Sequence, residues 1–210
     1  MEMSRKQNIQ RLISMGTGIP LERYRDRKLT EDDTRASFTF MGDVINKMPL
    51  LIDDTPALDI RTLRSRALRS AMKDGAPGLI IVDYLQLATD KSHKDRFQEV
   101  SSISRQLKQL AREMKCTVLA LSQLSRAVEG RQSKVPLLSD LRESGQIEQD
   151  ADIVAFIHRE ELFDKETDKK GIAELHISKH RNGRIGVIPL SFNSELTKFS
   201  DLSYRSMDGY

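Results

Sequence analysis

The sequence predicts an α/β fold, with a mostly parallel sheet flanked by helices and an antiparallel hairpin near the C-terminal end. Three observations lead to this prediction. Short apolar runs rich in β-branched residues at 79–82, 116–121 and 153–157 are typical of strands buried on both faces of a parallel sheet. A long amphipathic segment separates the first two runs, which is the order of a strand–helix–strand unit. Asn182-Gly183 separates two further strand-like runs and is a strong hairpin signal.

The N-terminal quarter predicts helices. Ser4 can cap the first helix, whose apolar positions share a face and which we expect to end at Gly16. Pro20 fits the start of a second helix. Thr30, followed by three acidic residues, fits the start of a third. We expect a short strand at 49–53, where an apolar run ends in acid.

Two longer helices are predicted between the strands. One runs from Ile60 to about Lys73 and is capped by Asp59. The other, from about Asp95 to Lys115, has the clearest periodicity in the chain. Its apolar residues lie within an arc of about 140° and comprise Phe97, Val100, Ile103, Leu107, Leu110, Ala111 and Met114. The polar stretch 125–139 indicates a loop, strands follow at 173–178 and 185–192, and we expect one domain over 1–210.

Composition and charge limit the classes of protein to which the chain can belong. Hydrophobic residues make up 38% and charged residues 31% of its 210 residues, as in a globular domain. No apolar run approaches the roughly 18 residues of a membrane span, and the single cysteine, Cys116, excludes a disulfide framework. A reducing, cytoplasmic location is therefore expected. The net charge of +3 permits nucleic-acid binding without requiring it, and the four histidines lack metal-ligand spacing.

In an open parallel sheet, ligands bind beyond the carboxyl ends of the strands, so polar residues that end strands are the first candidates for a site. Asp83 follows the run Leu-Ile-Ile-Val, where a carboxylate can hold hydrated Mg²⁺ beside phosphate oxygens. A turn or helix cap explains this residue equally well, because an apolar run ending in one acid is a weak motif. Gln123 follows the neighbouring strand and can donate to a phosphate or orient a water. Taken alone, it is better interpreted as a loop residue.

Two cations precede the predicted hairpin turn. Lys179 and Arg181 are two residues apart on one strand, so their side chains point the same way and can clamp a phosphate. An ordinary solvated hairpin is the simpler interpretation of these residues alone. The phosphate-loop pattern GxxxxGK[ST] does not occur in the sequence, since no glycine is followed by lysine.

Four segments taken together resemble one family. They are LIIVDYLQL at 79–87, LALSQLSR at 119–126, SDLRESGQIEQDAD at 139–152 and SKHRNG at 178–183. In order and spacing they are similar to the RecA-like motor domain of DnaB-type hexameric replicative DNA helicases. The opening Glu2-Met3-Ser4 resembles the end of that family's SLEMS segment. The likeness covers nearly the whole chain and implies a RecA-like fold that is incomplete at its N-terminal side.

The resemblance implies a nucleotide site with ATP and Mg²⁺ as cofactors. Asp83 matches the acid that organises Mg²⁺ at the ATP, and Glu2 matches the carboxylate that polarises the attacking water. Gln123 matches the residue that senses the γ-phosphate and couples the site to DNA. Lys179 and Arg181 match the basic pair inserted into the neighbouring subunit's ATP site, with the arginine finger acting in trans.

The resemblance also implies contacts with DNA and with other proteins. Arg142, Glu143 and Gly145 match the central-channel loop that follows the backbone of single-stranded DNA. Arg11 matches a basic position that we assign to the nucleotide side. The partners implied are single-stranded DNA, a homo-oligomeric hexameric ring or intact helicase subunits, and also primase and a helicase loader. No membrane partner is expected.

The chain departs from the family pattern at its N-terminal side. The first strand, the phosphate-cradling loop with its Lys and Ser/Thr, and the primase-binding domain are not among its 210 residues. Backbone amides and one lysine normally supply most phosphate contacts, so we expect the isolated chain to have little or no ATPase activity. Loss of a central strand is expected to leave exposed sheet edges that favour association.

Several functions are compatible with the sequence. The first is part of an ATP-dependent replicative DNA helicase, which couples ATP hydrolysis to translocation on single-stranded DNA and to duplex unwinding during replication. The second is a non-catalytic subunit that binds single strands or modulates a hexamer. A recombinase-like RecA relative is a third, against which the segments at 139–152 and 178–183 weigh. A metabolic enzyme of the same fold class has no local support.

Overall fold

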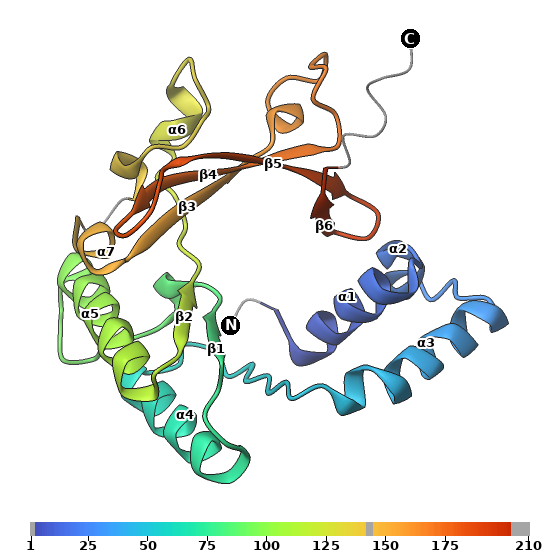
Figure 1. Cartoon of the computed structure of the whole chain (residues 1–210), viewed down its shortest axis with the longest axis horizontal. Helices are drawn as coiled ribbons and strands as arrows, with labels where there is room; N and C mark the ends of the chain where they lie inside the picture. The colour runs from blue at the N-terminus through green and yellow to red at the C-terminus, as the bar shows by residue number, and fades with distance from the viewer. Residues whose placement is uncertain (1–2, 142–144, 203–210) are drawn as a thin grey trace. The chain divides into compact units, whose positions relative to one another are not determined.

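The chain divides into two compact units in a computed structural model that describes residues 3–141 and 145–202 (Figure 1). The first unit contains Thr55–His158 and His176–Gly186. The second contains Met3–Asp54, Arg159–Leu175 and the described residues from 187 onward. No described helix combines the length and apolar character that a bilayer crossing needs.

The first unit is built on a parallel pair of strands. β1 (Leu79–Val82) pairs in parallel with β2 (Thr117–Ala120). α4 (Ile60–Asp74) precedes β1, and α5 (Arg96–Met114) connects the two strands (Figure 1). The predicted strand–helix–strand unit is therefore confirmed.

Apolar side chains of α4, α5 and the two strands form the core of this unit. On α5, Val100 and Ile103 have no exposed surface and Leu110 is 1% exposed. Burial of each such side chain contributes about 1.5–3 kcal/mol, so α5 fixes the position of the strands. Phe97 was expected on the same face but is 54% exposed, because it lies in the first turn of α5, before the core begins at Val100.

Shorter elements connect the strand pair to the rest of the unit. They are η2 (Leu85–Leu87), α6 (Ala127–Gly130), η3 (Leu138–Asp140), α7 (Gly145–Asp150) and β3 (Ile153–His158). The predicted loop at 125–139 contains α6 and the start of η3 but no strand. The buried Asp140 holds this loop by accepting hydrogen bonds from Arg131, with Nη2 at 2.8 Å from Oδ2.

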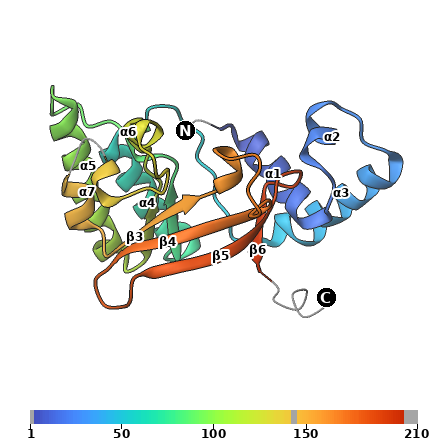
Figure 2. The ribbon, with the colours of Figure 1, turned by 90° about the horizontal axis from the view of Figure 1, so that it is seen from above.

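A second sheet has the strand order β3-β4-β5-β6. Its further strands are β4 (Ile172–His180), β5 (Gly186–Asn193) and β6 (Lys198–Asp201), and β5 and β6 are antiparallel. Figure 2 shows β4 and β5 as the two long strands of one hairpin, and its turn contains Asn182-Gly183 as predicted. The division between the two units passes through both strands.

The second unit contains the three predicted N-terminal helices. They are α1 (Arg5–Thr17), α2 (Leu21–Arg25) and α3 (Glu31–Asp43), followed by η1 (Ile45–Lys47); η4 (Glu160–Leu162) belongs to the same unit. Ser4 and Thr30 form the capping boxes of α1 and α3, as their side chains predict.

Gly16 does not end α1, contrary to the prediction. Gly18 caps the helix instead, in the left-handed conformation with φ of 75°. Gly16 is needed for close packing, because a Cβ there would lie 2.0 Å from Cζ of the Phe40 ring on α3.

The strand predicted at 49–53 is wrong, because the segment has no strand partner. Arg5, at the start of α1, contacts the end of this segment and the residue that follows it. The Arg5 N–H donates to Oδ2 of Asp54 at 2.8 Å, and Arg5 Nη2 donates to the carbonyl of Ile52 at 2.8 Å. These contacts attach the end of the segment to the start of α1.

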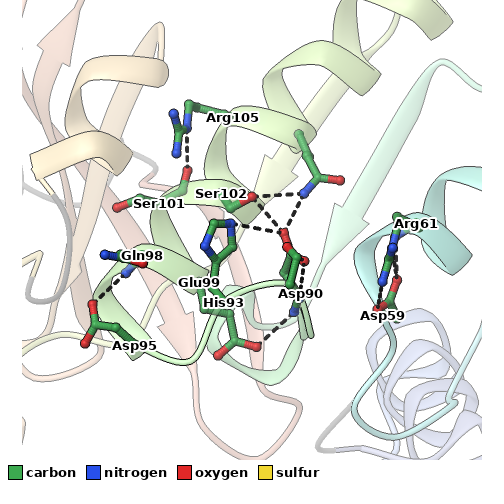
Figure 3. Close-up of polar contacts among 12 residues, drawn as sticks. Asp59, Arg61, Asp90, His93, Asp95, Gln98, Glu99, Ser101, Ser102 and Arg105 are labelled. Atoms are coloured by element: carbon green, nitrogen blue, oxygen red, sulfur yellow. Dashed lines mark hydrogen bonds and ion pairs between the residues drawn. The ribbon is translucent and has the colours of Figure 1, made fainter.

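A buried carboxylate organises the loop between η2 and α5 (Figure 3). Asp90 is 3% exposed. Its Oδ1 accepts from N and Oγ of Ser92 at 3.1 and 2.5 Å, and its Oδ2 accepts from Ser102 Oγ at 2.7 Å and Gln106 Nε2 at 2.9 Å. These hydrogen bonds, led by the Ser92 hydroxyl, lower the pKa of Asp90 to about 2.

We predict that Asp90 makes the free energy of unfolding depend on pH. Its folded pKa of about 2 lies below the value of 3.8 for a free side chain, so the carboxylate stabilises the native state above about pH 4 by roughly 2 kcal/mol. That contribution disappears as the pH falls from about 4 to 2. Asp90→Asn should therefore lower the urea unfolding free energy at pH 7, and the difference from the wild type should shrink at pH 3. Asp43→Asn, at an exposed carboxylate, is the control. An equal loss at both pH values would contradict the prediction.

Candidate functional site

The carboxyl ends of β1 and β2 lie at the same end of the strand pair. Val82 is opposite Ala120, and the Leu121 N–H donates to the Val82 carbonyl at 2.9 Å. The chain then continues to Asp83 beyond β1 and to Gln123 beyond β2. The predicted pairing of these two strands is confirmed, and it brings both candidate residues to one end of the pair.

Gln86 connects the two strand ends, and sequence reasoning missed it. Its Oε1 accepts from the Gln123 N–H at 3.2 Å, and its Nε2 donates to Ser122 Oγ at 3.0 Å and to the Gln123 carbonyl at 3.4 Å. A polar residue inside the otherwise apolar run 85–87 was the available signal. One amide side chain thus satisfies the backbone that presents Gln123.

The contacts of Gln86 lead back to the Asp90 loop. Arg96, in the first turn of α5, donates to the Gln86 carbonyl at 2.5 Å and to Glu99 Oε2 at 2.5 Å. Glu99 Oε1 in turn accepts from the Asp90 N–H at 2.8 Å (Figure 3). The strand ends are therefore attached to the helix that forms the core.

The side chains of Asp83 and Gln123 are open to a ligand. Asp83 is half-buried and Gln123 is exposed. Within the described residues, neither the Asp83 carboxylate nor the Gln123 amide has a hydrogen-bond or ion-pair partner. No cluster of three or more His, Cys, Asp or Glu suited to a metal occurs in the same part of the chain. One carboxylate beside phosphate oxygens is how Mg²⁺ is commonly held, so the residues fit a metal that arrives with a nucleotide.

The hairpin cations contact the end of α7. Lys179 Nζ donates to the carbonyl of Glu148, and Arg181 Nη2 donates to the carbonyl of Gln149 at 3.0 Å. Arg181 Nη1 also lies 3.5 Å from Oδ1 of Asp152. Both side chains reach the same helix end, as their spacing predicts, and their recorded partners do not include Asp83.

The other predicted site residues are not brought together by the described structure. Glu2, Arg142 and Glu143 lie outside the described residues. Gly145 is exposed at the first position of α7. Arg11 lies on α1 in the second unit. The roles that the resemblance implies for these five residues stay predictions.

A groove of about 790 Å³ lies between β2 and β3 in the first unit. The two strands belong to different sheets and are not paired with each other, yet residues 117–122 and 152–157 line the same space. Residues of α5 and α7 line it as well. Several large apolar side chains of the three strands of this unit, and of the residue after β2, are exposed: Leu79, Ile81, Leu119, Leu121, Ile153 and Ile157. Unpaired edges and uncovered apolar side chains are what the predicted loss of a central strand would leave.

Comparisons with known proteins agree with this geometry. The sequence profile of the DnaB-like helicase C-terminal domain matches residues 1–201. The chain is 45% identical over 210 residues to the replicative DNA helicase DnaC of Bacillus subtilis, covering 99% of this chain and 46% of that protein. It is 44% identical over 207 residues to the replicative DNA helicase DnaB of Geobacillus stearothermophilus, covering 98% and 45%. The chain thus spans about half the length of the curated relatives that it matches.

Two solved structures are similar in fold. One is a solved ATPase domain, which superposes with a TM-score of 0.89 at 40% identity, covering 96% of this chain and 72% of that one. The other is a DnaB-like replicative helicase, solved to describe its interactions with primase, which superposes with a TM-score of 0.88 at 40% identity, covering 96% and 49%.

The fold is that of a RecA-like helicase motor domain, which confirms the predicted class. The chain belongs to the family of the DnaB-like helicase C-terminal domain. This membership favours a helicase over the recombinase-like alternative.

We predict that Gln86 protects the Gln123 amide from exchange with solvent. Loss of one such hydrogen bond costs about 1 kcal/mol, so Gln86→Ala should raise the hydrogen-exchange rate of the Gln123 N–H about fivefold. Amide exchange followed by NMR measures this. Gln98→Ala is the control, because it leaves the strand ends untouched. Unchanged protection of Gln123 in Gln86→Ala would show that Gln86 does not hold it.

Proposed function

We propose that this chain is part of an ATP-driven replicative helicase that moves along single-stranded DNA and unwinds duplex DNA. The observation that carries the proposal is the pairing of β1 with β2, which brings Asp83 and Gln123 to one strand edge with open side chains. A carboxylate and an amide at neighbouring strand ends can act on one phosphate group from two directions.

In this proposal, the residues at the strand ends divide the work at the nucleotide. Asp83 holds Mg²⁺ against the phosphate oxygens of ATP, and Mg²⁺ neutralises the charge that develops on those oxygens. Gln123 donates to the γ-phosphate from a backbone fixed by Gln86. Glu2 polarises the attacking water, and Arg11 belongs to the nucleotide side.

Lys179 and Arg181 act on the ATP of a neighbouring subunit. Support comes from their recorded partners, which lie at α7 and Asp152 rather than at Asp83. A guanidinium supplied in this way stabilises the charge of the transition state and raises the rate of hydrolysis by a factor of about 10³–10⁵. The proposal therefore requires an assembly of subunits, and we propose a hexameric ring.

The phosphate-binding loop comes from outside these 210 residues. Three observations support this step: the sequence contains no GxxxxGK[ST], the edges of β2 and β3 line a common groove, and the chain covers only 72% of the similar solved ATPase domain. A strand placed in the groove would have a partner on each side. Without it, the chain has little or no ATPase activity.

Single-stranded DNA is bound by the residues Arg142, Glu143 and Gly145, largely through main-chain amides at the DNA backbone. Primase and a helicase loader are proposed as partners of the whole protein, and one relative was solved for its interactions with primase. A non-catalytic subunit that modulates an intact helicase stays the alternative, because the cations that act in trans do not need an ATP site in the same chain.

A complementation assay tests the proposed function. The helper is the B. subtilis helicase in which the residues aligned with Lys179 and Arg181 are alanine, so that it keeps its phosphate loop and lacks the cations. We expect no phosphate release from this chain alone and a helper ATPase rate that rises at least tenfold when the chain is added. The same chain with Arg181→Ala should give no rise. Turnover by the chain alone, or no rescue by the wild type, would contradict the proposal.

We predict that DNA binding falls steeply with salt. Each neutralised phosphate of a single strand contributes a slope of about −0.7, so two to three contacts weaken binding of an oligo-dT about tenfold between 50 and 200 mM salt. Fluorescence anisotropy measures this. Arg142→Ala should make the slope shallower by about 0.7. Lys170→Ala, in the second unit, is the control and should leave the slope unchanged. An affinity that is independent of salt would exclude neutralisation of DNA phosphates by cationic side chains such as Arg142.

A further inference from the structure

We propose that Asp152 is a positioning residue for Arg181, which it holds where the guanidinium can reach a neighbouring subunit's nucleotide. This inference rests on the proposed trans action of Arg181. Asp152 stands between α7 and β3, two residues after the end of the helix that accepts from both hairpin cations.

Asp152 holds Arg181 by both its main chain and its side chain. The Arg181 N–H donates to the Asp152 carbonyl at 2.8 Å, and Arg181 Nη1 lies 3.5 Å from Asp152 Oδ1. The carbonyl of Gln149 accepts from Nη2 at 3.0 Å. The place of the backbone and the direction of the guanidinium are therefore set by one short segment.

The Asp152 carboxylate is itself anchored to the core helix. Its Oδ2 accepts from Nζ of Lys108 on α5, a side chain that is 22% exposed. This hydrogen bond lowers the pKa of Asp152, so the carboxylate is ionised at neutral pH. Arg181 is thus tied through Asp152 to the helix that also packs against β1 and β2.

The charges around Asp152 explain why its carboxylate is needed. Four cations, Arg105, Lys108, Arg112 and Arg181, line one small open cavity of about 230 Å³, where the only carboxylate among the described lining residues is that of Asp150, which accepts from Ser104 and Gln146. Lys108, Arg181 and Arg112 all act electrostatically on Asp152. Without the negative charge of Asp152, the repulsion of Arg181 by Lys108 and Arg112 would be less opposed, which favours other positions of the guanidinium.

The guanidinium is held without being enclosed. The Arg181 side chain is 48% exposed, and an arginine has five N–H donors, of which Gln149 and Asp152 engage a minority. A planar group fixed on one side and open on the other can still donate to a phosphate. This geometry is better suited to presenting the Arg181 guanidinium to a phosphate than to keeping it away from one.

The complementation assay with the helper tests the proposal directly. Asp152→Asn should lower the maximal rescued ATPase rate on the order of tenfold, because a misplaced catalytic group costs rate steeply. The chain concentration that gives half of the maximal rescue, and the melting temperature, should not change. Asp152→Glu keeps the charge and should recover at least half of the lost rate. Asp43→Asn removes one exposed, ion-paired carboxylate in the second unit and should rescue like the wild type.

Each other outcome has a definite meaning. If wild-type chain rescues the helper and Asp152→Asn rescues equally well or better, Asp152 does not position Arg181, while the proposed function stands. If the loss comes with a lower melting temperature or a higher half-maximal concentration, Asp152 acts on folding or assembly, and the proposal is wrong. If wild-type chain gives no rescue, the proposed function fails and this inference fails with it.

Discussion

The parallel pairing of β1 with β2 is the constraint on which the candidate site depends. Backbone hydrogen bonds continue past the strands, from Leu121 to Val82 and from Leu85 to Leu121, so the segments that carry Asp83 and Gln123 cannot separate without breaking the ladder. Beyond this point, the side-chain amide of Gln86 bonds the N–H and carbonyl of Gln123 in place of further hydrogen bonds between the two backbones. The candidate site is therefore positioned by the sheet, and the side chains of Asp83 and Gln123 take no part in holding the strand ends together.

The same helix supports both parts of the proposed chemistry. One face of α5 buries Val100, Ile103 and Leu110 against the strands, and the first turn of the helix reaches Gln86 through Arg96. Lys108, on another face, reaches Asp152 beside the hairpin. Strand ends and hairpin cations are therefore held by one rigid element, although in the proposed ring they serve the nucleotides of different subunits.

The sequence predicts the parts of the fold that depend on local patterns. Hydrophobic runs and caps locate α1 to α5, β1 to β5 and the hairpin turn, because burial and capping act over a few residues. It fails where distant contacts decide. The run at 49–53 has the pattern of a strand, but its Ile52 carbonyl accepts a hydrogen bond from Arg5 in place of a strand partner. The predicted helix end at Gly16 does not take into account the ring of Phe40, which packs against this glycine. The contacts of Gln86 and Asp152 could not be predicted for the same reason, since their partners, Gln123 and Lys108, lie 37 and 44 residues away in the sequence.

In the proposed function, the phosphate loop and the strand ends come from different segments, which has a physical consequence for the chain. In this proposal, Asp83 and Gln123 meet the charge of a nucleotide only if backbone amides bind its phosphates from another segment, and Arg181 meets it only across a subunit boundary. Each of these three side chains lowers the stability of the chain little, because none of them is buried without a partner. The groove between β2 and β3 is different, since its unpaired edges and apolar walls favour pairing with another segment. In the proposed function, completion of the sheet and assembly of the nucleotide site are therefore expected to be one event.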